Sequence, residues 1–199
     1  MIKLNKVNKS EPYLLFKKFY DEALLKSQKS IQAICISSFN TSTNQVESRF
    51  VNLKYINDDR WIFFSNYNSQ KAQDFLTHRQ ISAVFYWDSL NVQIRIKATI
   101  EKTSEEFSDN HYKSRSKEKN ALAISSNQSE IIESYSKVVA KFKTISENAE
   151  ILSKRPNFWG GYSFTPFYFE FWEGHELRLN KRDVYQVKEN NWEHLILQP

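Results

Sequence analysis

Val92-Gln-Ile-Arg-Ile-Lys-Ala-Thr-Ile-Glu101 is the most regular stretch of the chain, because apolar and polar residues alternate through it without a break. Successive side chains of a β-strand point to opposite faces of the sheet, so this alternation predicts a strand with one buried face. The strand-like segments at residues 80–87 and 91–102 are predicted to pair as a hairpin. The polar face, which carries Gln93 and Arg95, must meet water, a ligand or another subunit.

Further strands are predicted on both sides of this hairpin, with helices between them. The predicted strands are residues 31–37, 47–55, 60–66, 161–173, 183–189 and 191–197. Helical spacing predicts helices from Ser10 to about Ser27, from Asn68 to Arg79, and from a Thr103–Glu106 capping box to about Ser146, with a break near 114–120. The strands come in adjacent pairs and do not alternate with helices. The predicted fold class is therefore α+β, with a closed or nearly closed antiparallel barrel.

No repeat, linker or low-complexity block divides the 199 residues, so one domain spanning residues 1–199 is predicted, with residues 1–10 flexible. No run approaches 18 apolar residues and the N-terminus is unlike a signal peptide, which predicts a cytoplasmic protein with no membrane partner. The single cysteine, Cys35, is expected to be a buried, unreactive thiol. The four histidines lack metal-ligand spacing, so no metal site is predicted.

Composition excludes several ways of binding a ligand. The chain has three glycines and neither a G-x-G-x-x-G motif nor a Walker loop, so side chains must hold any phosphate. The net charge of +5 is a mild basic excess. It falls short of a nucleic-acid footprint unless the cations cluster on one face, so no nucleic-acid partner is predicted.

The first cluster of candidate functional residues joins two strands to the following helix. Arg49 and Lys54 bracket one strand, and Ser65, Ser69 and Lys71 follow the next. Such cations and hydroxyls can clamp a phosphate, although cations in these positions are also commonly solvated. A regular strand would place Arg49 and Lys54 on opposite faces. Both would reach one ligand only through a bulge, a curl or a long side chain.

Two more clusters lie near the end of the chain. Trp159-Gly-Gly-Tyr162 leads into an aromatic strand, which indicates either a β-bulge or a close approach of the backbone to another group. Arg178 and Arg182 lie four residues apart, beside Phe169-Glu-Phe-Trp172. Aromatic faces with nearby arginines fit an aromatic, phosphorylated ligand, and they also fit stacked single-stranded nucleic acid.

Taken in order, these segments resemble the pyridoxine/pyridoxamine 5′-phosphate oxidase family of FMN-binding split barrels, from about residue 11 to Pro199. The motifs that carry the resemblance are Arg49…Lys54, Ser65-Asn66…Ser69-Gln-Lys71, Gln93 with Arg95, Gln128-Ser129, Trp159-Gly-Gly-Tyr162, Glu170-Phe-Trp172 and Arg178-Leu…Arg182. The resemblance implies an antiparallel split β-barrel with flanking helices. It also implies a homodimer that holds FMN in a cleft between its two chains.

The resemblance further implies which side chains hold the cofactor. The matching positions are Arg49, Phe50, Val51, Asn52, Leu53, Lys54, Phe64, Ser65, Gln70, Lys71, Gln93, Gln128, Ser129, Trp172 and Arg182. The family often has arginine where this chain has Gln70, so one cation for the phosphate is missing. Side-chain cations otherwise replace a glycine loop, as the composition requires.

The positions for a small phosphorylated substrate match less well. They are Lys54, His111, Arg115, Lys119, Arg178 and Asn180, and the resemblance also assigns catalysis to Arg178. His111 stands where the family has tyrosine, Lys119 where it has serine, and Asn180 where it has histidine. The resemblance therefore implies a cofactor site that is largely kept and a substrate site that is altered.

Three functions stay open from the sequence. The first is an FMN-dependent oxidase that converts pyridoxamine or pyridoxine phosphate to pyridoxal 5′-phosphate, with oxygen as the acceptor. The second is an FMN oxidoreductase of the same fold that acts on another small anionic molecule. The third is a protein that holds flavin or a nucleic acid without turnover.

Overall fold

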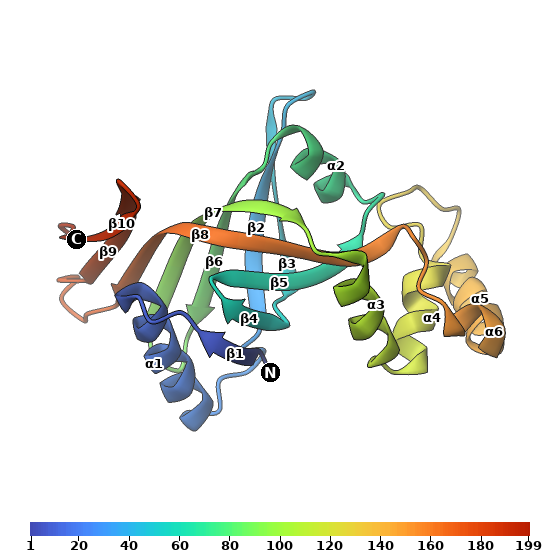
Figure 1. The fold of residues 1–199 in the computed structure, drawn as a ribbon, viewed down its shortest axis with the longest axis horizontal. Coiled ribbons are helices and arrows are strands. Elements are labelled where there is room, and N and C mark those ends of the chain that lie inside the picture. Colours follow the sequence, from blue (N-terminus) through green and yellow to red (C-terminus); the bar gives the residue numbers. More distant parts are fainter.

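A computed structural model describes every residue from Met1 to Pro199. One sheet of ten strands runs through the molecule, and helices α3 to α6 gather at one end of it (Figure 1). The strands are β1 (Lys3–Val7), β2 (Ala33–Asn40), β3 (Gln45–Asn52), β4 (Tyr55–Asp58), β5 (Arg60–Asn66), β6 (Gln80–Trp87), β7 (Val92–Lys102), β8 (Trp159–Glu173), β9 (Lys181–Lys188) and β10 (Asn191–Ile196). The helices are α1 (Glu11–Leu25), α2 (Gln70–Thr77), α3 (Glu105–Lys113), α4 (Lys117–Ser125), α5 (Tyr135–Ser146) and α6 (Ala149–Ser153).

The long strand β8 organises the sheet because it changes partner along one edge. Residues 159–164 pair with β5 and residues 168–173 pair with β9, while β7 runs along the other edge. The main path is β1-β4-β5-β8-β7-β6-β2-β3, and every pair is antiparallel except β1 with β4. The predicted α+β split barrel is confirmed.

The core lies on the apolar face that the alternating stretch predicts. Val92, Ile94, Ile96, Ala98 and Ile100 on β7 are all at most 2% exposed, and they belong to a cluster of 30 buried residues. Helix α1 closes this core, with the Phe16 ring 4.4 Å from that of Trp61. Burial of side chains this large contributes roughly 2–3 kcal/mol each, which explains why the aromatic residues concentrate here.

Some boundaries and details differ from the sequence predictions. Residues 1–10 include a strand that was not predicted: β1 pairs with β4, and the Tyr20 hydroxyl bonds both the N–H and the carbonyl of the buried Ile2. Ser104 rather than Thr103 caps α3, accepting from the N–H of Phe107. Cys35 is half-buried rather than buried, because it lies on the face of β2 opposite the core.

The predicted strand at residues 47–55 is also divided between β3 and β4. The helix α6 was not anticipated. No helix is long and apolar enough to cross a membrane.

Candidate functional site

A cavity of about 810 Å³ lies between the sheet and helices α2, α3 and α4. This size suits a ligand as large as a nucleotide-like cofactor. Its lining residues come from five strands, three helices and the loops between them: Met1, Lys3, Arg49, Phe50, Val51, Asn52, Lys54, Tyr55, Phe64, Ser65, Asn66, Lys71, His111, Ser114, Arg115, Ser116, Lys119, Leu122, Ala123, Ser126, Gln128 and Trp159.

Arg49 and Lys54 both line this cavity because the chain does not run as one strand between them. Strand β3 ends at Asn52, Leu53 turns into the core with no exposed surface, and β4 begins at Tyr55. Because the strand ends at Asn52, Arg49 and Lys54 are not forced onto opposite faces of one regular strand.

One end of the cavity carries a first cationic pair, Arg49 and Lys71. Lys71 is only 6% exposed, and its ammonium donates to the Ser69 hydroxyl over 3.0 Å. Burial, and then the charge of Arg49, lower the pKa of Lys71 to about 8, while Asp74 opposes the shift. The Ser65 hydroxyl, which lines the same cavity, donates to Oε1 of Gln128 over 3.5 Å. A buried lysine beside an arginine is suited to an anion.

A second cationic cluster, Lys54, Arg115 and Lys119, lines the same cavity. The Arg115 guanidinium lies 4.2 Å from the centre of the Trp159 ring and donates from Nη2 to the Lys119 carbonyl over 2.8 Å. Its Nη1 is buried without a hydrogen-bond partner. Burial, and then the charges of Lys119 and Arg115, lower the pKa of Lys54. Mutually repelling cations and an unpaired buried donor favour binding of an anion.

His111 stands beside this second cluster as a neutral ring. It stacks on Phe64 with centroids 3.6 Å apart, and its Nδ1 lies 2.8 Å from the Tyr55 hydroxyl. Burial and the charges of Arg115, Lys54, Lys3 and Lys119 lower the pKa of His111 to about 4. The imidazole is therefore uncharged near neutral pH.

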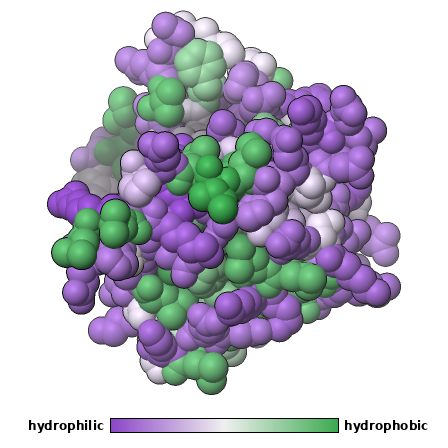
Figure 2. All heavy atoms as spheres, turned by 90° about the vertical axis from the view of Figure 1, so that its left-hand side faces the viewer, coloured by the Kyte–Doolittle hydropathy of each residue, from purple (hydrophilic) through white to green (hydrophobic).

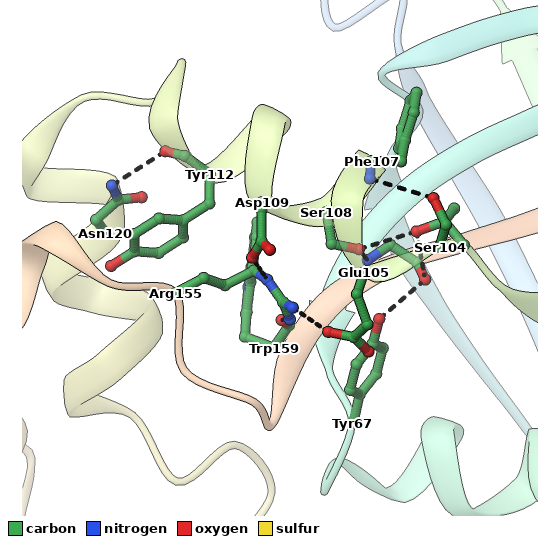
Figure 3. Close-up of polar contacts among 12 residues, drawn as sticks. Tyr67, Ser104, Glu105, Phe107, Ser108, Asp109, Tyr112, Asn120, Arg155 and Trp159 are labelled. Atoms are coloured by element: carbon green, nitrogen blue, oxygen red, sulfur yellow. Dashed lines mark hydrogen bonds and ion pairs between the residues drawn. The ribbon is translucent and has the colours of Figure 1, made fainter.

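Helix α3, which carries His111, is held against β8 by a polar network (Figure 3). Arg155 pairs with both Glu105 and Asp109 and donates to the carbonyl of Trp159 over 2.5 Å. The side-chain amide of Asn120 donates to the Tyr112 carbonyl over 3.2 Å, which ties α4 to α3. This network fixes the helices that present the second cationic cluster.

The paired glycines serve close packing within the chain. Gly160 and Gly161 stay in register with Ser65 and Phe64 of β5, so there is no bulge here. A Cβ on Gly160 would lie 2.1 Å from the Tyr67 hydroxyl, and one on Gly161 would lie 2.5 Å from Oγ1 of Thr103. The predicted close approach is confirmed, with protein side chains as the neighbours.

Three predicted cofactor residues lie outside the cavity, on the polar face of β7, β8 and β9. Gln93 pairs with Trp172, and Trp172 pairs with Arg182, so the three form one row across the strands. Both Nε and Nη2 of Arg182 donate to the buried carboxylate of Glu170, at 2.9 and 2.8 Å, and Arg95 donates to the same carboxylate. We name Gln93, Trp172 and Arg182 the sheet-face row.

Arg178 and Asn180 also lie outside the cavity, in the exposed turn between β8 and β9. Arg178 has a left-handed backbone, with φ of 62°, and the Asn180 side chain accepts from the N–H of His175 over 3.0 Å. Within one chain, the structure therefore does not bring these two residues to the other predicted substrate residues. Gln70 and Ser129 are exposed and do not line the cavity either, and the Gln70 side chain instead bonds Asp74.

The structure adds cavity residues that the sequence analysis missed. Lys3 reaches the cavity because β1 pairs with β4 in parallel, and Tyr55 lies directly opposite it in the register. Trp159 was singled out in the sequence as part of the paired-glycine motif but not as a site residue, and its ring supplies the surface on which Arg115 lies. Only the parallel pairing of the first residues with β4 brings Lys3 here, and no local sequence pattern signals it.

The fold and the cavity together define a split-barrel protein with a cleft lined by lysine and arginine side chains. Residues 21–149 match the family profile described as pyridoxamine 5′-phosphate oxidase, and residues 159–199 match the pyridoxine 5′-phosphate oxidase C-terminal dimerisation region. The chain belongs to the pyridoxine/pyridoxamine 5′-phosphate oxidase family.

Individual relatives agree with this assignment. The chain is 34% identical over 192 residues to a pyridoxine/pyridoxamine 5′-phosphate oxidase of Leptospira biflexa, covering 95% of this chain and 89% of that protein. It is 36% identical over 192 residues to the protein of that name from a Nostoc species, covering 94% and 88%. Among solved structures, PhzG from Burkholderia lata, in complex with tetrahydrophenazine-1-carboxylic acid, superposes with a TM-score of 0.86 at 27% identity, covering 96% and 93%.

Proposed function

We propose that this chain is an FMN-dependent oxidase of pyridoxamine or pyridoxine 5′-phosphate. The observation that carries the proposal is one cavity with two separate cationic clusters, Arg49 with Lys71 and Lys54 with Arg115 and Lys119. A cofactor phosphate and a substrate phosphate each need such a cluster, because no glycine-rich loop is present to supply backbone donors.

The residues present fit FMN. Its phosphate would be held by Arg49, Lys71 and the Ser65 hydroxyl, and its ring by the residues of β3 and by Gln128. The buried donor of Arg115 and the buried ammonium of Lys71 both lack an anionic partner within the chain. Buried donors in that state gain most from a charged acceptor, which supports two anionic groups in the cavity.

Bound FMN would supply the two-electron acceptor, taking a hydride from the carbon that bears the amine or alcohol, with oxygen as the final acceptor that leaves as hydrogen peroxide. The chain supplies position and charge. Lys54, Arg115 and Lys119 bind and orient the substrate phosphate. His111, held by Tyr55 and Phe64, remains neutral, so it can take part in one hydrogen bond there without adding a positive charge to the three cations.

The sheet-face row supports a homodimer in which each chain completes the cavity of the other. The cleft side chains and the row are parts of one predicted cofactor site, yet they lie on different parts of one chain. Figure 2, which faces the end formed by β9 and β10, shows apolar patches on a mainly hydrophilic surface. The exposed apolar side chains there include Leu177, Leu179, Val187 and Ile196. Residues 159–199 also match a dimerisation region.

Anaerobic mixing tests the proposed reaction. Pyridoxamine phosphate added without oxygen to the FMN-loaded protein should bleach the flavin absorbance, and air should restore it. If neither pyridoxamine phosphate nor pyridoxine phosphate bleaches the yellow protein, it is a flavin binder or an enzyme for another substrate.

The second candidate function is oxidation of a different small anionic molecule. Two observations favour it: His111, Lys119 and Asn180 depart from the family pattern, and the fold superposes on PhzG bound to an aromatic carboxylic acid. A planar carboxylate could lie against Arg115 and Trp159 as a phosphate could. Bleaching by an aromatic carboxylate but not by pyridoxamine phosphate would decide for this candidate.

Sedimentation equilibrium should report a mass twice that of one chain at micromolar concentration. A family-like interface is expected to be obligate, burying on the order of 2,000 Å² or more.

Mixed dimers test more sharply whether the two chains share each site. Lys71→Ala and Arg182→Ala should each bind FMN poorly, but refolding them together should restore about a quarter of the sites, since one site in each mixed dimer has both residues. No recovery on mixing would place Lys71 and Arg182 in the site of the same chain.

FMN binding should depend on pH through Lys71, whose neighbours Arg49 and Asp74 are the charged groups facing it. Lys71 carries its charge below a pKa of about 8 and loses it above. The FMN phosphate becomes dianionic above about pH 6. The preference for FMN over riboflavin should therefore be greatest between about pH 6 and 8 and fall as pH rises beyond that window. Titrations of both flavins by fluorescence quenching check this, and a preference unchanged up to pH 9 would contradict it.

A further inference from the structure

A buried carboxylate lies directly behind the first cationic pair. Asp74, in the middle of α2, is 2% exposed, and no lysine, arginine or histidine forms an ion pair with it. Its two oxygens accept only from neutral groups: Oδ1 from the Gln70 amide over 3.1 Å and Oδ2 from the Ser38 hydroxyl over 2.6 Å. Burying a carboxylate without a cation in direct contact costs folding free energy, so a compensating role for Asp74 is expected.

Ser38 links this carboxylate to Arg49. The Ser38 hydroxyl donates to Asp74, which leaves its lone pairs free, and Nη1 of Arg49 donates to the same oxygen over 2.6 Å. Nη1 also donates to the backbone carbonyl of Glu47 over 2.9 Å. Both side-chain hydrogen bonds of Arg49 come from Nη1, so Nε and Nη2 remain available to a ligand.

We propose that Asp74 is a positioning residue for the cavity's phosphate-binding arginine, acting through Ser38 to hold Arg49 in its binding orientation. The inference rests on the proposed function, because it takes the ligand of Arg49 and Lys71 to be the FMN phosphate. Two hydrogen bonds of one buried hydroxyl thus join Asp74 on α2, Ser38 on β2 and Arg49 on β3, and we call this chain of contacts the relay. A side chain that is already held in its binding orientation loses less conformational entropy when the ligand binds, so binding is tighter.

A positioning role and a purely electrostatic role of Asp74 predict opposite changes in FMN affinity when the carboxylate is removed. If Asp74 acted only as a nearby negative charge, its removal would strengthen binding of an anionic phosphate. If Asp74 holds Arg49 in place, its removal weakens that binding. Riboflavin, which has the same ring system without the phosphate, should be unaffected in either case.

The experiment compares Kd values for FMN and riboflavin, by quenching of flavin fluorescence, in the parent and in Asp74→Asn, Ser38→Ala and Glu47→Gln. Measurements at pH 6.5 keep Lys71 protonated. Asp74→Asn and Ser38→Ala should each lower the preference for FMN by about tenfold, with riboflavin binding unchanged. Glu47→Gln removes an exposed carboxylate beside Arg49 but keeps the backbone carbonyl, and should lower nothing.

The double variant Asp74→Asn/Ser38→Ala should be no worse than either single variant, because both remove the same relay. Unchanged or tighter FMN binding in Asp74→Asn would overturn the proposal, as would equal losses in Glu47→Gln. Retained riboflavin binding shows that a variant has folded. A parent protein without any preference for FMN over riboflavin would instead refute the proposed phosphate site, before the variants are considered.

Discussion

Pyridoxamine phosphate should be used at least about 100-fold better than pyridoxamine, measured as kcat/KM, because Lys54, Arg115 and Lys119 face the cavity without a carboxylate among them. Their mutual repulsion is relieved only by an anion. Arg115→Gln should remove most of this preference, since it deletes the buried donor that has no partner. Lys117→Gln, at an exposed position of α4 outside the cavity, is the matched control and should change nothing.

Equal use of the phosphorylated and unphosphorylated amines by the parent would refute the anion preference. The double variant Lys119→Ser/Asn180→His restores two family residues and tests the substrate itself. It should raise turnover of pyridoxamine phosphate if lost contacts limit the reaction. Asn180 also accepts a hydrogen bond in its turn, so thermal stability of the double variant must be compared with that of the parent. A stable double variant without any gain would favour a different anionic substrate.

Lys71→Ala should weaken FMN binding by about tenfold or more and leave riboflavin binding unchanged. Charge-assisted hydrogen bonds contribute roughly 1.5–3 kcal/mol each, and a buried ammonium is poorly replaced by water. Flavin titration measures both affinities. Lys141→Ala, at an exposed position of α5, serves as the control. Equal losses for FMN and riboflavin would show a general disturbance of the cavity, and an unchanged FMN affinity would remove Lys71 from the phosphate site.

The strands were the part of the fold most open to prediction. The limits of β6 and β7 agree with the sequence prediction to within a residue, because a half-buried strand must alternate apolar and polar side chains. The helix breaks were predicted only roughly. Ser104 takes the cap that Thr103 was expected to supply, since Thr103 instead bonds Ser108 and the carbonyl of Gly161. That alternative partner comes from β8, more than fifty residues away.

The candidate site, like the fold, could be predicted only in part from the sequence. The sequence identifies Arg49, Lys54 and Lys71 as cations that could clamp one phosphate. All three line the cavity, but Lys54 lies with Arg115 and Lys119 rather than with the other two. The sequence does not reveal Asp74, whose spacing in α2 is that of any solvated helix position. Its role depends on Ser38, thirty-six residues earlier, and on the packing of α2 against β2.

The sequence by itself determined the fold class, the buried face of the central hairpin and the absence of a glycine-rich phosphate loop. Each of these depends on local periodicity or on which residue types are present. Only the tertiary structure decided that the first residues form a strand carrying Lys3 to the cavity, that Arg115 lies on Trp159, and that the sheet-face row lies apart from the cleft. These outcomes depend on pairings between distant segments, and the free energy of such pairings comes from burial and register that no single stretch of sequence contains.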